Sequence, residues 1–225
     1  LQQKGCSLQY LTLHVGAGTF KPVKSETIEG HDMHTEFISV PKQVIENICE
    51  FKSQQTEVIT PLPPREGAGE GPLFLATGTT SVRTLESLYY IGEKLTAIQA
   101  SVGEGWAESV HAEDLIVRQW EPYDEEHTLS LDASLAQILA YLDATHQDML
   151  VTATQILIAP GFQYRLIDGI ITNFHMPQST LLLLVSALVD GASLEGPNWH
   201  RIYQYALDHD FRFLSYGDSS LLFRK

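Results

Sequence analysis

The chain has 225 residues, 44% hydrophobic and 19% charged, with a formal net charge of −14 at pH 7. A chain of this length buries roughly 70% of its unfolded surface, so it needs neither a disulfide nor a metal to hold a core. No apolar run approaches the ~18 residues of a membrane span, no signal-peptide pattern is present, and Cys6 and Cys49 form no C-x-x-C motif. A globular protein of the cytoplasm with reduced thiols is expected.

The negative charge is concentrated in one segment. Between Glu104 and Asp148 there are eleven acidic residues and one basic residue, Arg118, whereas the rest of the chain carries 17 acidic and 13 basic residues. Net acidity argues against a nucleic-acid partner. Because the motif-bearing parts of the chain are nearly neutral, this objection is weak.

The first predicted strand, residues 8–15, runs into a glycine-containing loop. Gly16 and Gly18 permit close approach of a ligand to the backbone, and Phe20 follows them. The third glycine and the helix of a dinucleotide fingerprint are missing, so a plain strand-to-loop turn is the alternative.

Two histidines and a glutamate come next. In a strand, His34 and Glu36 share one face and His31 lies on the other, and no H-E-x-x-H helix is present. The pattern favours acid/base or hydrogen-bonding roles over a metal site. A solvated strand start is the alternative.

Residues 36–40 predict a strand, and Pro41 predicts the first position of a helix that ends near Ser53. The Pro/Gly-rich residues 60–72 predict an exposed loop, and the apolar residues 73–77 predict a central strand.

The turn after this central strand is rich in hydroxyl groups. Gly78 precedes Thr79, Thr80 and Ser81, whose side chains can cap the following helix. Arg83 lies in the first turn of that helix, where a cation is unfavourable without an anion nearby, so it predicts a bound carboxylate or phosphate. The Walker lysine is missing, and an exposed helix charge is the alternative.

Residues 99–130 predict a small subsidiary sheet or flap, because tryptophans lie there among polar residues. Residues 132–147 predict a helix. Two strands are expected next, at residues 154–158 and 162–166.

Residues 168–191 are the most informative stretch. Ile170 and Ile171 predict the end of a buried strand, after which Asn173 and His175 follow, and Pro177 prevents the strand from continuing. A capped connection with a satisfied histidine is the alternative to a site.

Ser179 or Thr180 can cap the next helix, which is apolar on every side and therefore expected to be buried. Residues 198–210 predict an amphipathic helix, and residues 211–214 predict a last strand. In the turn after it, Asp218 is a candidate ligand carboxylate or a turn aspartate.

Strands alternate with helices along the chain. This predicts an α/β fold with a mixed, mostly parallel sheet flanked by helices, plus the small subsidiary β or flap segment. Ligands bind at the carboxyl ends of strands in such folds, where the polar loops lie.

Six motifs, taken together and in order, resemble the S-adenosylmethionine:tRNA ribosyltransferase-isomerase family of queuosine biosynthesis. They are LTLHVGAGTFKPV (11–23), HDMHTE (31–36), ATGTTSVRTLES (76–87), APGF (159–162), DGIITNFHMPQSTLLLLVSAL (168–188) and FRFLSYGDSSLL (211–222).

The resemblance implies that residues 1–225 are the C-terminal part of the catalytic α/β domain. It also implies an acidic insertion at about residues 92–150 and a missing N-terminal part that includes the β-barrel lobe. Intact activity is in doubt for such a chain.

The resemblance further implies the reaction. The ribosyl group of S-adenosylmethionine is transferred to 7-aminomethyl-7-deazaguanine at the wobble position of tRNA and isomerised to epoxyqueuosine, while adenine and methionine leave. S-Adenosylmethionine is a consumed substrate, no metal or cofactor is implied, and a monomer with no membrane attachment is expected.

The roles expected from the resemblance divide into two sets. The catalytic candidates are His175 as acid or base, with Glu36, His34 or Asp218 as the second titrating group. The substrate-binding candidates are Gly16, Gly18, Phe20, His31, Gly78, Thr79, Thr80, Arg83, Asn173, Ser179, Thr180 and Tyr216.

Two rival functions remain open from the sequence. One is a metal-assisted hydrolase that uses His31, His34, Glu36 and Asp218. The other is a non-catalytic fragment that binds nucleoside or RNA.

Overall fold

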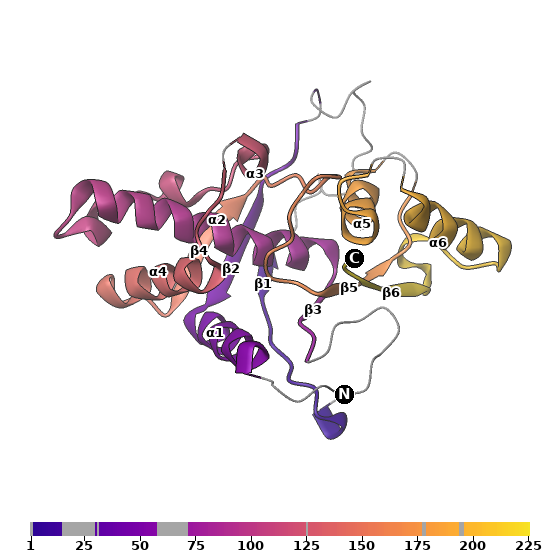
Figure 1. The fold of residues 1–225 in the computed structure, drawn as a ribbon, viewed down its shortest axis with the longest axis horizontal. Helices are drawn as coiled ribbons and strands as arrows, with labels where there is room; N and C mark the ends of the chain where they lie inside the picture. Colours follow the sequence, from indigo (N-terminus) through magenta and orange to yellow (C-terminus); the bar gives the residue numbers. More distant parts are fainter. Residues whose placement is uncertain are drawn as a thin grey trace.

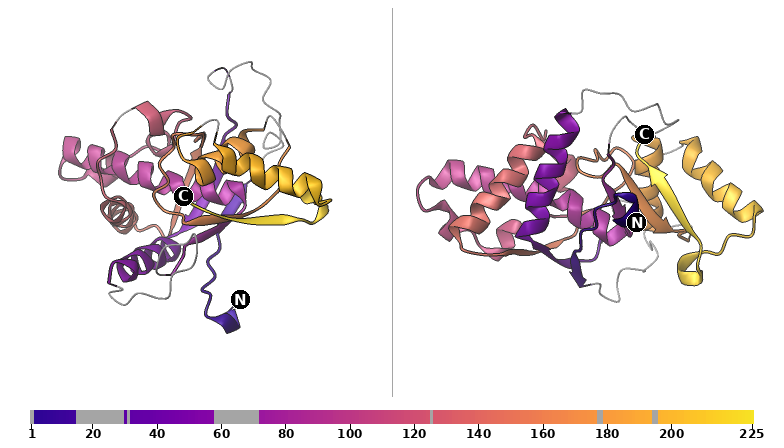
Figure 2. Two further views of the ribbon diagram at one scale, coloured as in Figure 1. Left: turned by 45° about the vertical axis from the view of Figure 1, so that its right-hand side comes forward. Right: turned by 90° about the horizontal axis from the view of Figure 1, so that it is seen from below.

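The computed structural model describes residues 2–14, 30, 32–57, 72–124, 126–176, 179–193 and 196–225. These residues form two three-stranded sheets with helices packed against them (Figure 1). The helices α1, α2 and α4 lie toward one end of the long axis and α5 and α6 toward the other, in all three views (Figures 1 and 2).

The first sheet has the strand order β1 (Thr12–His14), β2 (Glu36–Pro41) and β4 (Met149–Thr154). Both pairings are antiparallel, and Glu36 pairs with Thr154. Alternate residues of β2 point to opposite faces, so Ile38 and Glu36 are buried while Phe37 is exposed. This alternation places the Glu36 side chain inside the protein.

The second sheet has the order β3 (Leu75–Thr77), β5 (Gly169–Asn173) and β6 (Ser219–Phe223). β3 and β5 are parallel, whereas β5 and β6 are antiparallel. One edge of the second sheet therefore carries the carboxyl ends of β3 and β5 and the beginning of β6.

The α/β class is confirmed, but the expectation of a mostly parallel sheet is wrong, because three of the four strand pairings are antiparallel. Alternating strands and helices give parallel pairs when each helix returns the chain to the same sheet. Here α1 (Lys42–Glu57) leads from β2 in the first sheet to β3 in the second. The alternation therefore does not determine strand direction.

The long helix α2 (Thr79–Val102) packs closely on α4 (Leu131–Ala144) at Gly92. A Cβ atom on Gly92 would lie 2.2 Å from the backbone oxygen of Ser134. The Ser134 hydroxyl donates to the Tyr89 carbonyl at 2.6 Å. Glycine is required here because only a backbone without a side chain allows the two helices to approach this closely.

The helix α5 (Thr180–Asp190) is largely buried, as its apolar sequence predicts, and Gly191 ends it with a φ of 67°. Asp190 accepts hydrogen bonds from the backbone N–H groups of Asn198 and Trp199, both at 3.0 Å. It thereby caps α6 (Pro197–Asp208), so the end of one helix orients the next.

The predicted subsidiary sheet in residues 99–130 is wrong for the described residues. That segment contains η2 (Trp106–Ser109), η3 (Ala112–Leu115) and α3 (Glu121–Asp124), with one isolated bridge from Val117 to Thr154. The Trp106 ring lies 6.2 Å from the Tyr141 ring on α4, so it supports helix packing rather than a flap.

Three predicted strands are also misplaced. The strand expected at residues 154–158 lies earlier, as β4, and residues 162–166 form no strand. The rings of Phe211 and Phe213 pack on the Phe174 ring, with centroid distances of 5.4 and 5.6 Å. Residues 211–214 therefore do not form the predicted strand. The last strand is β6, after the turn η4 (Leu214–Tyr216). Within the described ranges, no helix combines the length and apolarity needed to cross a bilayer.

Candidate active site

The parallel pairing of β3 with β5 brings two predicted loops to one edge of the second sheet. Thr77 pairs with Ile171, and the Gly78 backbone N–H donates to the Ile171 carbonyl at 2.8 Å. Gly78 adopts a φ of 87°, a left-handed conformation that favours glycine. The Gly78–Thr80 turn is therefore next to the segment that follows β5.

Glu36, at the start of β2, is the centre of a buried polar cluster. Its side chain is 1% exposed, and Oε1 lies 3.0 Å from His34 Nε2. The Thr80 hydroxyl donates to the same oxygen at 3.3 Å, and Arg83 Nη1 lies 2.8 Å from Oε2. We call these four residues the Glu36 cluster.

The ion pair between Arg83 and Glu36 is close but poorly directed. Nη1 is within ion-pair distance of Oε2, yet Oε2 accepts no hydrogen bond of good geometry. The short distance between Nη1 and Oε2 still gives an electrostatic attraction, because Coulomb attraction does not require an aligned N–H. One carboxylate oxygen in the cluster therefore retains hydrogen-bonding capacity.

Arg83 is fixed by further contacts inside the protein. Its side chain is 2% exposed, Nε donates to the Ile156 carbonyl at 2.9 Å, and Nη2 donates to the His34 carbonyl at 3.3 Å. Burial lowers the pKa of the guanidinium, and Glu36 partly offsets this effect. The sequence predicts an anion beside Arg83, and the structure supplies one from within the chain, Glu36.

His175, the predicted catalytic acid or base, is buried behind the end of β5. Its Nε2 lies 3.0 Å from the Thr172 hydroxyl, and its backbone N–H donates to the Tyr203 hydroxyl at 3.1 Å. Burial lowers the pKa of the imidazole to about 4. At neutral pH His175 is therefore uncharged.

Asp218 lies directly before β6, at the same edge as Asn173, which pairs with Ser219. Its Oδ2 accepts from the backbone N–H and from Nε of Arg212, at 2.6 and 3.2 Å, and these bonds lower the pKa of the carboxyl. Tyr216 is 72% exposed. The Asn173 amide oxygen accepts from the Ser219 hydroxyl at 3.2 Å.

The predicted hydroxyl caps do not form. Gly78 occupies the N-cap of α2, and the Thr80 hydroxyl is directed at Glu36 instead. Ser179 is at the N-cap of α5 as predicted, but its hydroxyl donates to the Met176 carbonyl at 2.9 Å, and Thr180 is the buried first residue of the helix. Neither helix has a side-chain cap on its first N–H groups.

Seven of the predicted residues thus fall into three groups near strand ends. His34, Glu36, Thr80 and Arg83 are in contact, His175 belongs to a second group, and Asn173 and Asp218 lie at the β5–β6 edge. Four predicted residues lie outside the described part of the chain: Gly16, Gly18, Phe20 and His31. Among the residues that the structure does describe, no three His, Cys, Asp or Glu side chains are placed to hold a metal ion.

Sequence reasoning missed Glu86, which is fully buried on α2. Its carboxylate accepts from the backbone N–H groups of Arg165, Leu166 and Ile167 at 2.8, 3.1 and 3.0 Å. A carboxylate flanked by the apolar residues Leu85 and Leu88 of a helix was the available signal.

The contacts define an α/β protein in which the buried carboxylate at the start of β2 meets a half-buried histidine and a buried guanidinium from α2. A sequence model described as "Queuosine biosynthesis protein" matches residues 1–61 and 124–222, more than half of the chain. The chain belongs to this family. The match includes His34, Glu36 and His175 and leaves out the segment that carries Thr80 and Arg83.

Among solved structures, the chain is similar to an S-adenosylmethionine tRNA ribosyltransferase from Thermotoga maritima, with 25% sequence identity and a TM-score of 0.44. The similarity covers 83% of this chain and 40% of that protein. The chain thus spans less than half the length of this structural neighbour.

Proposed function

We propose that this chain carries the acid/base part of an enzyme that transfers and isomerises the ribosyl group of S-adenosylmethionine onto 7-aminomethyl-7-deazaguanine in tRNA. The product is epoxyqueuosine at the wobble position, with adenine and methionine as leaving products. Membership of the queuosine biosynthesis family supports the pathway. The Glu36 cluster is the single structural observation that supports the chemistry.

The reaction requires a base near a sulfonium. The positive sulfur acidifies the neighbouring C–H bonds, and a positioned imidazole can remove a proton there, leaving the electron pair on carbon beside the sulfonium. We assign this role to His34, whose side chain is 19% exposed and contacts a carboxylate. Glu36 stabilises the imidazolium that forms.

His175 has a different role in this proposal. Its Nε2 is engaged by Thr172 and its side chain is buried, so it has less access to a substrate than His34. We propose that it supports the loop after β5, where Asn173 and Asp218 are available for substrate hydroxyl groups.

The activity is tested with the purified protein, adenine-labelled S-adenosylmethionine, and tRNA that carries the aminomethyl base. Release of adenine and methionine together with a mass gain on the wobble base supports the proposal. Formation of S-adenosylhomocysteine would show methyl transfer and overturn it, as would binding of both substrates without adenine release. Activity that requires a metal and stops with a chelator would favour the metal-assisted hydrolase.

Glu36→Gln tests the carboxylate at the centre of the cluster. We expect turnover to fall by about 10²-fold or more, because the amide cannot stabilise a charged imidazole, while S-adenosylmethionine still binds. Glu50→Gln, at an exposed position of α1, is the matched control and keeps its activity. Normal turnover in Glu36→Gln would contradict the assignment.

A further inference from the structure

The imidazole of His34 meets two groups of opposite hydrogen-bonding character at one nitrogen. Nε2 lies 3.0 Å from Glu36 Oε1, which can only accept, and 3.2 Å from Arg83 Nη1, which can only donate. Only one of these contacts can be a hydrogen bond at a time. The other contacts of Arg83 and Glu36 decide which hydrogen bond forms.

Arg83 has other partners besides the His34 ring. Its Nη1 lies 2.8 Å from Glu36 Oε2 as an ion pair without an aligned hydrogen bond, its Nε donates to the Ile156 carbonyl, and its Nη2 donates to the His34 carbonyl. Glu36 Oε1, in contrast, gains a charge-assisted bond if Nε2 carries a proton. A bare Nε2 would place its lone pair 3.0 Å from a carboxylate oxygen, which is repulsive.

We infer that Arg83 and Thr80 are positioning residues that hold Glu36 so that His34 carries its proton on Nε2 and presents a bare Nδ1 as the reacting atom. This inference rests on the proposed function. Arg83 of α2 lies 2.8 Å from one carboxylate oxygen, and the hydroxyl of Thr80, in the first turn of the same helix, approaches the other at 3.3 Å. Both residues act on the substrate only through Glu36 and His34.

The charges around His34 come from two elements. Among the described residues, Glu36 of β2 and Arg83 of α2 contact the imidazole, while Asp32, before the same strand, is exposed. Glu36 and Arg83 are therefore the charged groups that meet the His34 ring, and they meet it at the same nitrogen.

The tautomer of His34 can be measured by NMR in the absence of substrate. In protein labelled with ¹⁵N at histidine, long-range ¹H–¹⁵N spectra at neutral pH are expected to show a protonated Nε2 and a bare Nδ1 for His34, assigned by comparison with His34→Asn. In Arg83→Met and in Thr80→Val the bare-nitrogen signal is expected to weaken as the two tautomers mix. A protonated Nδ1 in the unaltered protein would overturn the inference even if the enzyme proves active.

Kinetics separate positioning from substrate binding. Thr80→Val, which keeps the side-chain shape, is expected to lower kcat about 10-fold with little change in KM for S-adenosylmethionine. If Arg83 or Thr80 instead binds the substrate, KM rises and the His34 spectrum is unchanged, which overturns the inference. Thr96→Val, on the same helix and directed at the Gly92 carbonyl, is the matched control for loss of a hydroxyl. Thr80→Val also provides the test if Arg83→Met does not fold.

Discussion

At the scale of single residues, the burial of His175 affects the stability of the protein. Its position after a strand predicts a catalytic acid or base, but the residue is 7% exposed and bonded to Thr172 and Tyr203. Burial lowers the pKa of this imidazole to about 4, so protonation of His175 opposes folding.

The stability of the protein is expected to fall as the pH drops through this range. The unfolded chain binds the proton at the ordinary pKa of about 6.5 and the folded chain only near 4, so the stabilisation is complete above about pH 6.5 and is lost as the pH falls toward 4. The shift corresponds to about 3 kcal/mol.

Urea unfolding at pH 7 and pH 4.5 measures this contribution. The free energy of unfolding should fall less between these pH values in His175→Asn than in the unaltered protein. His146→Asn is the control, since His146 is exposed and its φ of 54° suits asparagine. Equal pH dependence in His175→Asn and the unaltered protein would contradict the role of burial.

At the scale of elements, Glu86 explains why the segment after Pro160 is not a strand. Strand formation would satisfy its N–H groups with a neighbouring strand, but the Glu86 carboxylate accepts the three N–H groups of residues 165–167. Burial raises the pKa of this carboxyl, and the three N–H groups oppose the rise.

Glu86→Ala is therefore expected to lower the free energy of unfolding by about 3–5 kcal/mol, because three donors lose their acceptor inside the protein. Glu86→Gln should be milder, since one amide oxygen still accepts. Chemical unfolding compares both with Glu46→Gln on α1, a half-buried carboxylate at the surface. A loss below about 1 kcal/mol in Glu86→Ala would show that other groups or water satisfy these donors.

The connection between α5 and α6 allows a second test at this scale. Gly196 has an ordinary φ of −59°, yet a Cβ there would lie 2.3 Å from the Cβ of Asp190. Gly196→Ala should displace the carboxylate that caps α6 and lower the free energy of unfolding by about 1–2 kcal/mol. Asp190→Ala should have a similar effect, and the double variant should cost less than the sum, because both changes remove the same cap.

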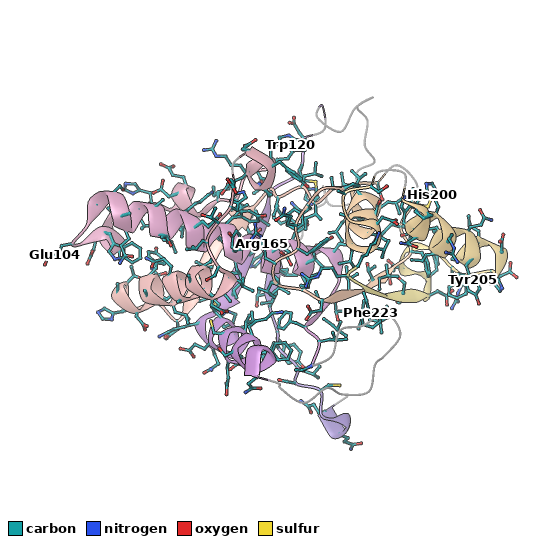
Figure 3. All side chains as sticks on the ribbon, in the orientation of Figure 1. Glu104, Trp120, Arg165, His200, Tyr205 and Phe223 are labelled. Carbon is teal, nitrogen blue, oxygen red and sulfur yellow. The ribbon has the colours of Figure 1, made fainter. Side chains whose placement is uncertain are left out.

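At the scale of the whole molecule, the acidic segment begins far from α6 and reaches the Glu36 cluster only later, where Gln119 accepts from the Met33 backbone N–H beside His34. Glu104 lies at one end of the long axis and Tyr205 on α6 at the other (Figure 3). The acidic segment begins at this Glu104 end, whereas His175 contacts α6 through Tyr203. A tRNA bound near the strand ends would experience the acidic segment as a long-range repulsion.

Neutralising exposed carboxylates in that segment should strengthen the proposed binding of tRNA. We expect the triple variant Glu104→Gln, Glu108→Gln, Glu113→Gln to bind tRNA several-fold more tightly at low salt. The gain should shrink above about 0.1 M salt, where the Debye length falls below ~10 Å. The corresponding Glu→Asp triple variant keeps the charge and should bind like the unaltered protein. Weaker binding by the Gln variant would instead indicate that this segment takes part in recognition.

The sequence by itself determined the α/β class, the long helices and the polar side chains that follow the strands. The buried face of α1, with Val44, Ile45 and Ile48, and the apolar α5 were predictable because helical periodicity is a local property. Turn glycines such as Gly191 were predictable for the same reason.

Only the tertiary structure decided strand direction, the burial of His175 and the partner of Arg83. The carboxylate beside Arg83 lies 47 positions earlier in the chain, and the acceptor for residues 165–167 lies about 80 positions earlier. Spacing along the chain does not report such contacts, because they depend on which sheet each strand joins. The same sheet assignment places a histidine, a carboxylate and a guanidinium within 3.2 Å of one another.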